Sequence, residues 1–223
     1  MERLKKKLGP LANLEFDKLF VGQILSHFAD AIIQFLLAVA IFSISKDSGK
    51  EIALMFSMFL IPQLLFSPMG GALCDRISRK LILSLSCLFR VLVIVALTIY
   101  MPKISIMSIY IFVFLLGSGA AFFYPAKKSI LPNIVNRSQL KYANAITSPV
   151  GAVALLLGVL GTALLLSFDY YHAYCLVAGM YLIAAILVPF IKIKFSQDLY
   201  KKEEKKNELA ATYEYLKKHK KAL

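Results

Sequence analysis

Six long apolar segments, separated by short polar ones, make up most of the chain. Each has roughly the 20 residues that a helix needs to cross the ~30 Å hydrocarbon core of a bilayer. Lipid offers backbone groups no hydrogen-bond partners, so we expect all six to be helical. The predicted spans are Leu19–Ser43, Ile52–Leu73, Leu81–Tyr100, Ile104–Phe123, Ala145–Phe168 and His172–Ile191. The pattern therefore predicts an all-α membrane protein.

The polar ends of the chain define three regions. Residues 1–18 are predicted to be an N-terminal tail without a cleavable signal peptide, and residues 19–194 the bundle. Residues 195–223 are rich in Lys and Glu, with Leu209, Tyr213 and Leu216 at helical spacing. This last region fits either a basic amphipathic helix on the membrane surface or a solvated linker.

Composition supports a membrane protein, and the charge distribution gives its orientation. Hydrophobic residues make up 59% of the 223, and the formal net charge is +13. All but four of the 26 Lys and Arg lie in the two tails and in the second and fourth loops; the others are Lys46, Lys50, Arg90 and Lys103. The positive-inside rule then predicts a multi-pass protein of the cell membrane with both termini cytoplasmic. Its expected macromolecular surroundings are the lipid bilayer, not nucleic acid.

The polar residues of the first span lie on one face of the predicted helix. They are Gln23, Ser26, His27, Asp30 and Gln34, spaced at three- and four-residue intervals. A carboxylate at the bilayer centre costs about 2.5–3.5 kcal/mol even on insertion scales, so this face cannot contact lipid. We expect it to line a cavity or a helix interface.

Asp30 and Arg90 are predicted to pair. Asp30 lies about 18 Å beyond Lys18, and Arg90 about 15 Å beyond Lys80 on the same side. No other formal charge lies inside a predicted span. Two roles stay open: a static ion pair that fixes packing, or a cavity charge that couples to protons or binds solute. His27 either tunes Asp30 or is satisfied by a neighbouring helix.

The sequence contains no pattern typical of an enzyme or a metal site. The cysteines and histidines are scattered, with no metal-ligand spacing: Cys74, Cys87, Cys175, His27, His172 and His219. No nucleophile–base set or phosphate-binding loop is present. We therefore expect no catalytic residues, no metal and no cofactor.

Several segments carry signals for bends and close packing. Pro62 and Pro68 should bend the second span. In the fifth span, Ala154, Gly158 and Thr162 form a row of small residues that favours a close helix contact. The segment from Tyr124 to Ala143 is predicted to start extended and then to form a helix capped near Asn136 or Ser138.

A dense charged turn joins the second and third spans. Its sequence from Gly70 to Lys80 resembles the loop signature of the major facilitator superfamily. The matching positions are Gly71, Asp75, Arg76, Arg79 and Lys80, with Ser78 in place of a second glycine. The resemblance implies a latch that closes the cytoplasmic side. We expect Asp75 where the third helix begins, because a helix N-terminus favours a carboxylate.

Two further stretches resemble one branch of this superfamily, the lysophospholipid transporters and the macrolide and enterobactin exporters. One is Gly22–Asp30 in the first span. The other is the central loop motif with Pro125 and Lys127, followed by Asn144. The resemblance implies an amphipathic or lipophilic solute, such as a lysophospholipid or a drug-like molecule, moved by efflux.

The resemblance covers one half of the family's architecture, six spans built from two inverted three-helix repeats. It implies an N-terminal half of a secondary active transporter working by alternating access, with Gln23, Ser26, Asp30, Gln34 and Arg90 lining the cavity. A second six-span half is then needed, from another copy or a separate C-terminal half. The alternative is a non-transporting membrane subunit or a truncated remnant.

Overall fold

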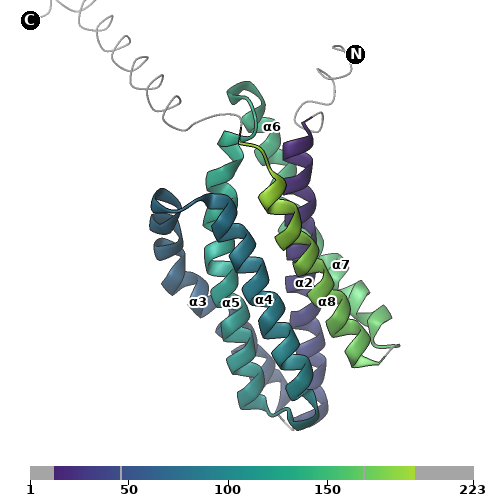
Figure 1. The fold of residues 1–223 in the computed structure, drawn as a ribbon. Coiled ribbons are helices and arrows are strands. Elements are labelled where there is room, and N and C mark those ends of the chain that lie inside the picture. The colour runs from purple at the N-terminus through teal and green to yellow at the C-terminus, as the bar shows by residue number, and fades with distance from the viewer. Residues whose placement is uncertain (1–12, 46, 168, 194–223) are drawn as a thin grey trace, which may run out of the picture.

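The computed structural model describes residues 13–45, 47–167 and 169–193, so the predicted C-terminal tail lies outside the described residues. Within these ranges, six helical stretches are long and apolar enough to cross a membrane, and they form an elongated bundle (Figure 1). The helices are α2 (Leu14–Ile44), α3 (Ser48–Arg76), α4 (Arg79–Tyr100), α5 (Ile106–Ile130), α6 (Arg137–Thr147), α7 (Val150–Leu165) and α8 (Tyr170–Leu187). Short 3-10 turns follow three of them: η2 (Met101–Lys103), η3 (Leu131–Asn133) and η4 (Val188–Phe190).

The bundle has two chemically different ends. The start of α2, the α3–α4 and α5–α6 connections and the end of α8 lie together, at the top of Figure 1. We call this the basic end, after Lys18, Lys80, Lys127 and Lys192. The other three connections, α2–α3, α4–α5 and α7–α8, lie at the opposite end. The described basic residues thus gather as the charge pattern predicted.

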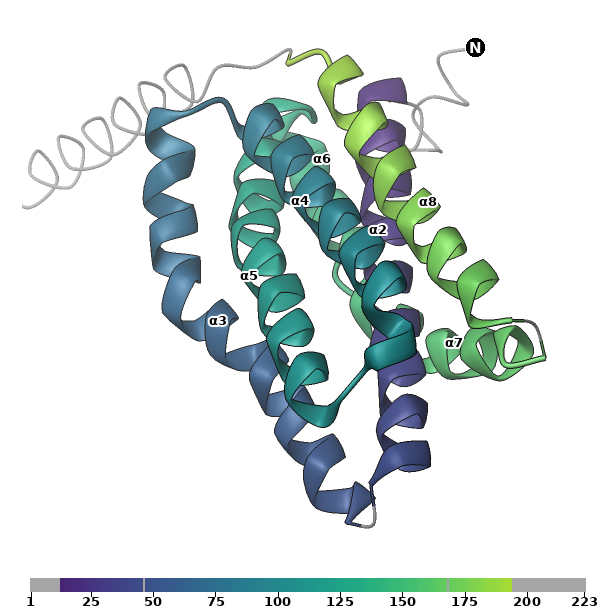
Figure 2. The same ribbon diagram turned by 60° about the horizontal axis from the view of Figure 1, so that its bottom comes forward.

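The spans form two groups of three, α2–α3–α4 and α5–α6/α7–α8, that run in opposite directions. The second span of each group packs on the first span of the other group, α3 on α5 and α7 on α2. The third spans follow the same rule, α4 on α5 and α8 on α2, and they also contact each other. Figure 2 shows α4 between α5 and α8. This exchange of contacts confirms the predicted inverted three-helix repeats.

Small residues set the closest helix contact on the α7 side. Ala154, Gly158 and Thr162 are all buried, as their spacing predicted. A Cβ atom on Gly158 would lie 2.5 Å from Cβ of Ala31 in α2. Only glycine permits this approach, so the row explains how α7 lies against α2.

Two apolar clusters fill the bundle. One lies toward the opposite end and includes Ile33, Leu37 and Val113. The other lies toward the basic end and includes Leu83, Phe123 and Ile130. Asp30 and Arg90 lie at the junction between the clusters, which accounts for their burial.

The central loop prediction was wrong in its first part. Instead of becoming extended at Tyr124, the chain stays helical through Pro125 to Ile130. Pro125 removes one helical hydrogen bond, the one to the carbonyl of Ala121. Gly70 of α3 packs directly against that carbonyl, since a Cβ there would lie 2.9 Å from its oxygen. The second part was right in position, because α6 begins after Asn136, but the Asn136 side chain makes no capping hydrogen bond.

Prolines interrupt the fifth span and lie inside the second, and only those of the second span were predicted to bend a helix. α6 and α7 together cover one membrane-length stretch, Arg137–Leu165, but they are separate helices on either side of Ser148 and Pro149. Pro62 and Pro68 lie inside α3, which changes direction along its length in Figure 2. A break and a bend on two peripheral spans leave α2, α4, α5 and α8 as the inner framework.

Candidate functional site

The predicted pair of Asp30 and Arg90 is formed. Nη1 of Arg90 lies 3.1 Å from Oδ1 and 3.2 Å from Oδ2 of Asp30. Both side chains are enclosed, with Asp30 4% and Arg90 0% exposed. Counting residues along the two helices placed Asp30 and Arg90 at similar depths in the membrane. In the structure, α4 packs against α5 and α8, which also contact α2, and this packing brings the two side chains together.

Two tyrosines complete the hydrogen bonding of Asp30. The Tyr181 hydroxyl donates to Oδ1 at 2.5 Å, and the Tyr124 hydroxyl donates to Oδ2 at 3.1 Å. We call Asp30, Arg90, Tyr124 and Tyr181 the ion-pair network. Sequence reasoning missed both tyrosine hydroxyls, although Tyr181 interrupts an otherwise apolar segment. With four helices contributing, the network ties α2, α4, α5 and α8 together.

Arg90 is held on every side. Its Nε donates to the carbonyl of Ser86 at 3.2 Å, and its guanidinium carbon lies 4.8 Å from the Phe123 ring centroid and 4.6 Å from that of Tyr181. Aromatic faces attract a cation in a desolvated setting. Gly119 makes room for the arginine stem, because a Cβ there would lie 2.7 Å from Cγ of Arg90. The network is a satisfied, closely packed unit.

Ser26 and Gln34 lie beside the pair without contacting its charges. Ser26 Oγ is 3.6 Å from Sγ of Cys87, and the Gln34 amide donates to the backbone carbonyl of Asp30 at 2.8 Å. These predicted cavity residues, with Asp30 and Arg90, line neither of the two pockets described below. Within the described half they are interface residues.

A polar pocket of about 280 Å³ opens between α2, α5 and the α6–α7 break. We call it the basic pocket and define it by the polar side chains that line it: Gln23, His27, Lys127, Lys128, Asn144, Thr147 and Ser148. Gln23 comes from the predicted cavity face, and Lys127 and Asn144 come from the central loop motif. Segments far apart in sequence therefore share one site.

Direct contacts link the pocket with the ion-pair network. Lys127 Nζ lies 3.3 Å from Nε2 of His27. The His27 ring stacks on Tyr124, with 5.3 Å between centroids, and Tyr124 in turn donates to Asp30. His27, which the sequence left between two roles, thus connects the charged interior with the basic pocket.

The residues of the charged turn are placed differently from the prediction. Asp75 lies in the last turn of α3, since α3 ends at Arg76 and α4 begins at Arg79. The expected N-terminal position was wrong: Asp75 lies at the C-terminal end of α3, and Ile77 and Ser78 separate this helix from α4. Asp75 and Arg76 are exposed, and Gly71 has open space beside its Cα.

Lys80 of the same turn contacts the end of α8. Its Nζ donates to the carbonyl of Ile191 at 3.0 Å. From α2, Lys18 donates to the carbonyl of Phe190 at 2.9 Å, and Glu15 accepts from the backbone N–H of Lys192 at 2.7 Å. Cations are favoured near the C-terminus of a helix. These three residues therefore fix where the chain leaves the bundle.

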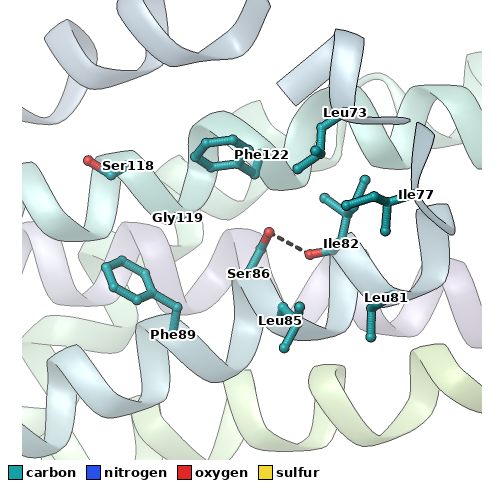
Figure 3. Close-up of a pocket in the computed structure, with 10 residues that line it drawn as sticks. All are labelled: Leu73, Ile77, Leu81, Ile82, Leu85, Ser86, Phe89, Ser118, Gly119 and Phe122. Atoms are coloured by element: carbon teal, nitrogen blue, oxygen red, sulfur yellow. Dashed lines mark hydrogen bonds between the residues drawn. The ribbon is translucent and has the colours of Figure 1, made fainter. Parts of the chain in front are cut away.

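An apolar groove of about 280 Å³ lies beside the charged turn, among α3, α4 and α5 (Figure 3). Its walls include Leu73, Leu85 and Phe122. The hydroxyl of Ser86 at its floor donates to the carbonyl of Ile82 at 2.6 Å. Since that hydroxyl is already satisfied, the groove offers mainly apolar surface.

Comparison with known proteins agrees with this geometry. The profile of the Major Facilitator Superfamily matches residues 19–222. The chain belongs to the major facilitator superfamily. It also resembles the uncharacterized MFS-type transporter YfiS of Bacillus subtilis (strain 168), with 24% identity over 175 residues.

That match covers 78% of this chain and 41% of the relative, so the chain spans less than half the length of this relative. No solved structure matches the chain. Membership of a transporter family agrees with the prediction that the protein is not an enzyme. The family and the packing together identify the fold as one six-span half of this superfamily.

Proposed function

We propose that the chain is one half of a secondary active transporter that moves an amphipathic or lipophilic solute across the cell membrane by alternating access. The observation that carries the proposal is the ion-pair network at the centre of a six-span bundle, linked by contacts to the basic pocket. Ionisable residues inside membrane spans mark solute or ion pathways more often than packing alone. In this proposal Asp30 and Arg90 either couple solute movement to protons or hold the helices in position. Gln23 and the other residues of the basic pocket bind the solute.

A second six-span half would complete the solute pathway, either from another copy of this chain or from a separate C-terminal half. Alternating access requires two halves that rock about a central site. The open space beside Gly71 and the exposure of Asp75 and Arg76 support contact with a second half at the basic end. We assign this latch to Gly71, Asp75, Arg76 and Arg79, with Lys80 holding the end of α8.

The proposed orientation places the basic end in the cytoplasm, together with both termini. The support is the positive-inside rule, applied to Lys18, Lys80 and the lysines of the basic pocket. Lysophospholipids and drug-like molecules are the proposed solutes, with efflux as the proposed direction, on the motif resemblance of the central loop.

Transport by membrane vesicles tests the proposal. Vesicles from cells producing the chain should move a fluorescent lysophospholipid, and Asp30→Asn should abolish this movement while the protein stays in the membrane. Asp169→Asn, which changes an exposed carboxylate at the opposite end, is the matched control and should transport normally.

The same preparation tests the need for a second half. Native mass measurement should find two copies, or one copy with a separate C-terminal half. A monomer whose vesicles move no lysophospholipid would overturn the proposal in favour of a non-transporting subunit. Full transport by Asp30→Asn would restrict Asp30 to packing.

A further inference from the structure

The basic pocket concentrates positive charge without a described counter-charge. Lys127 and Lys128 both line it, with His27 beside Lys127. The salt bridges of the described residues are Lys18–Glu15 and Arg90–Asp30, so neither pocket lysine has a described carboxylate within 4 Å. Lys127 is half-buried and Lys128 is exposed, and like charges on adjacent residues repel each other. A bound anion would relieve that repulsion.

Lys127 is held in place by one contact from α2 and one within its own helix, α5. Its Nζ is 3.3 Å from Nε2 of His27 and 5.7 Å from the centroid of the Tyr124 ring. Tyr124 belongs to the ion-pair network, so the ammonium group is positioned by the framework of α2 and α5. A charge positioned in this way is prepared for a ligand with little ordering cost.

Gln23 has a buried acceptor without a described partner, which is an independent indication of a bound ligand. Its Nε2 donates to the carbonyl of Thr147 at 2.7 Å, which determines the direction of the amide because a carbonyl can only accept. Its Oε1 is buried and has no partner among the described residues, in a side chain that is 1% exposed. Burying an unsatisfied acceptor is unfavourable. A ligand hydroxyl or ammonium beside the anionic group would satisfy it.

The helix break brings two opposite helix ends to the pocket. Ser148 and Gly151 line the pocket at the start of α7, which has 16 residues. The positive N-terminal end of α7 favours an anion, whereas the negative C-terminal end of α6, where Asn144 and Thr147 also line the pocket, disfavours one. The two helix ends therefore do not decide the charge of the ligand. Nothing acidic lines the pocket among the described residues. The two lysines therefore favour an anion, and the orphan oxygen of Gln23 favours a donor group beside that anion.

We propose that the basic pocket binds an anionic headgroup, a phosphate or a carboxylate, of an amphiphile. Lys127 and Lys128 neutralise the anion, Asn144 donates to it, and Gln23 accepts from a donor group next to it. A pocket of about 280 Å³ holds roughly nine waters at ~30 Å³ each, so it encloses the headgroup and leaves the alkyl chain outside. This inference rests on the proposed function, because it names the chemical class of the solute.

Equilibrium binding to the purified chain in dodecyl maltoside tests the inference without requiring transport. The probes are radiolabelled tetradecyl phosphate, tetradecyl trimethylammonium and inorganic phosphate. Tetradecyl phosphate should bind at least about tenfold more tightly than the cation, the effect of one charge-assisted hydrogen bond. Equal binding of the two amphiphiles would overturn the inference.

Variants locate the site. Lys127→Gln should weaken tetradecyl phosphate binding about tenfold or more, while Lys127→Arg should retain most of it. The matched control is Lys141→Gln, which removes the same charge from an exposed position on α6 outside the pocket and should bind normally. If both glutamine variants lose binding equally, the pocket is not the site. If Lys127→Gln does not fold, Lys128→Gln gives the same comparison.

Inorganic phosphate distinguishes the sources of the anion. Weak competition by inorganic phosphate would identify an amphiphile headgroup. Competition as strong as that of tetradecyl phosphate would overturn the amphiphile and identify a free anion. The two proposals fail separately: a chain that binds tetradecyl phosphate but transports nothing contradicts the proposed function, whereas transport that is insensitive to Lys127→Gln contradicts the pocket assignment.

Discussion

The ion-pair network and the basic pocket are neighbours joined through Tyr124 and His27, yet they are built on opposite principles. In the network, Asp30 meets one arginine and two tyrosine hydroxyls; Arg90 and Tyr181 are fully buried and Tyr124 is half-buried. In the pocket, Lys127 and Lys128 face open volume, and Gln23 keeps an unpaired oxygen. A satisfied buried network makes a structure rigid and unique, whereas unsatisfied polar groups mark a place for a ligand. The difference separates a positioning element from a binding element.

The largest effect should come from removing the cation of the network. Arg90→Ala leaves Asp30 buried and unpaired, which should cost about 3–5 kcal/mol in the free energy of unfolding. The measurement is thermal unfolding in dodecyl maltoside. Lys103→Ala, at an exposed position, is the control and should unfold as the wild type does. Wild-type stability of Arg90→Ala would show that the pair does not hold the bundle together.

A smaller loss is expected from a single hydroxyl. Tyr181→Phe removes a hydrogen bond to a carboxylate, which should cost about 1.5–3 kcal/mol in the free energy of unfolding. Tyr174→Phe is the matched control, because Tyr174 is also buried but its hydroxyl reaches only Sδ of Met101, at 3.5 Å. The same unfolding assay compares them. If the two variants lose equal stability, the hydrogen bond from Tyr181 to Asp30 does not contribute more than the contact of Tyr174 with Met101.

Crowding the arginine stem should cost about 1–3 kcal/mol, the usual price of overpacking a core. Gly119→Ala places its Cβ 2.7 Å from Cγ of Arg90, so the side chain or α5 must shift. Gly179→Ala is the control, because nothing lies within 4 Å of a Cβ at that helical position. It should keep or gain stability, since alanine favours a helix. Equal melting temperatures for the two variants would contradict the packing around Arg90.

The smallest effect on stability should be in the basic pocket. Lys127→Gln removes a half-buried charge with no described carboxylate partner, so the free energy of unfolding should change by about 0.5 kcal/mol or less. Transport of the fluorescent lysophospholipid should nevertheless fall. A destabilisation similar to that of Arg90→Ala would place Lys127 in the structural framework and remove the contrast between the two regions.

Much of the fold followed from the sequence. Apolar length predicted six spans, and the described structure has six stretches of membrane length. Helix spacing predicted a shared polar face on the first span and a close contact at Gly158. The sequence did not predict that the chain stays helical past Pro125. A single proline breaks one hydrogen bond, and the contact of Gly70 with the carbonyl of Ala121 is visible only after folding.

The sequence predicted the buried charges of the site, but not which other residues would gather around them or share a pocket. Counting residues along two helices placed Asp30 and Arg90 at matching depth, so their pairing followed from the cost of leaving either charge alone in lipid. The sequence did not identify Tyr181 and Tyr124 as partners of Asp30. A tyrosine in an apolar span can serve through the packing of its ring or through a hydrogen bond of its hydroxyl, and the sequence does not distinguish the two. Gln23, Lys127 and Asn144 came from separate motifs, and nothing in their spacing said that they share a pocket.

The sequence alone determined the membrane class, the number of spans, the position of the basic residues and the presence of a buried charge pair. Each of these depends on the free energy of moving the side chains of one helix from water into lipid. Tertiary structure decided which polar groups are satisfied and which are open. That outcome depends on contacts between residues as far apart as Gln23 and Thr147, and helix packing, not local preference, sets those contacts. Only the folded bundle separates the closed network around Asp30 from the open pocket around Lys127.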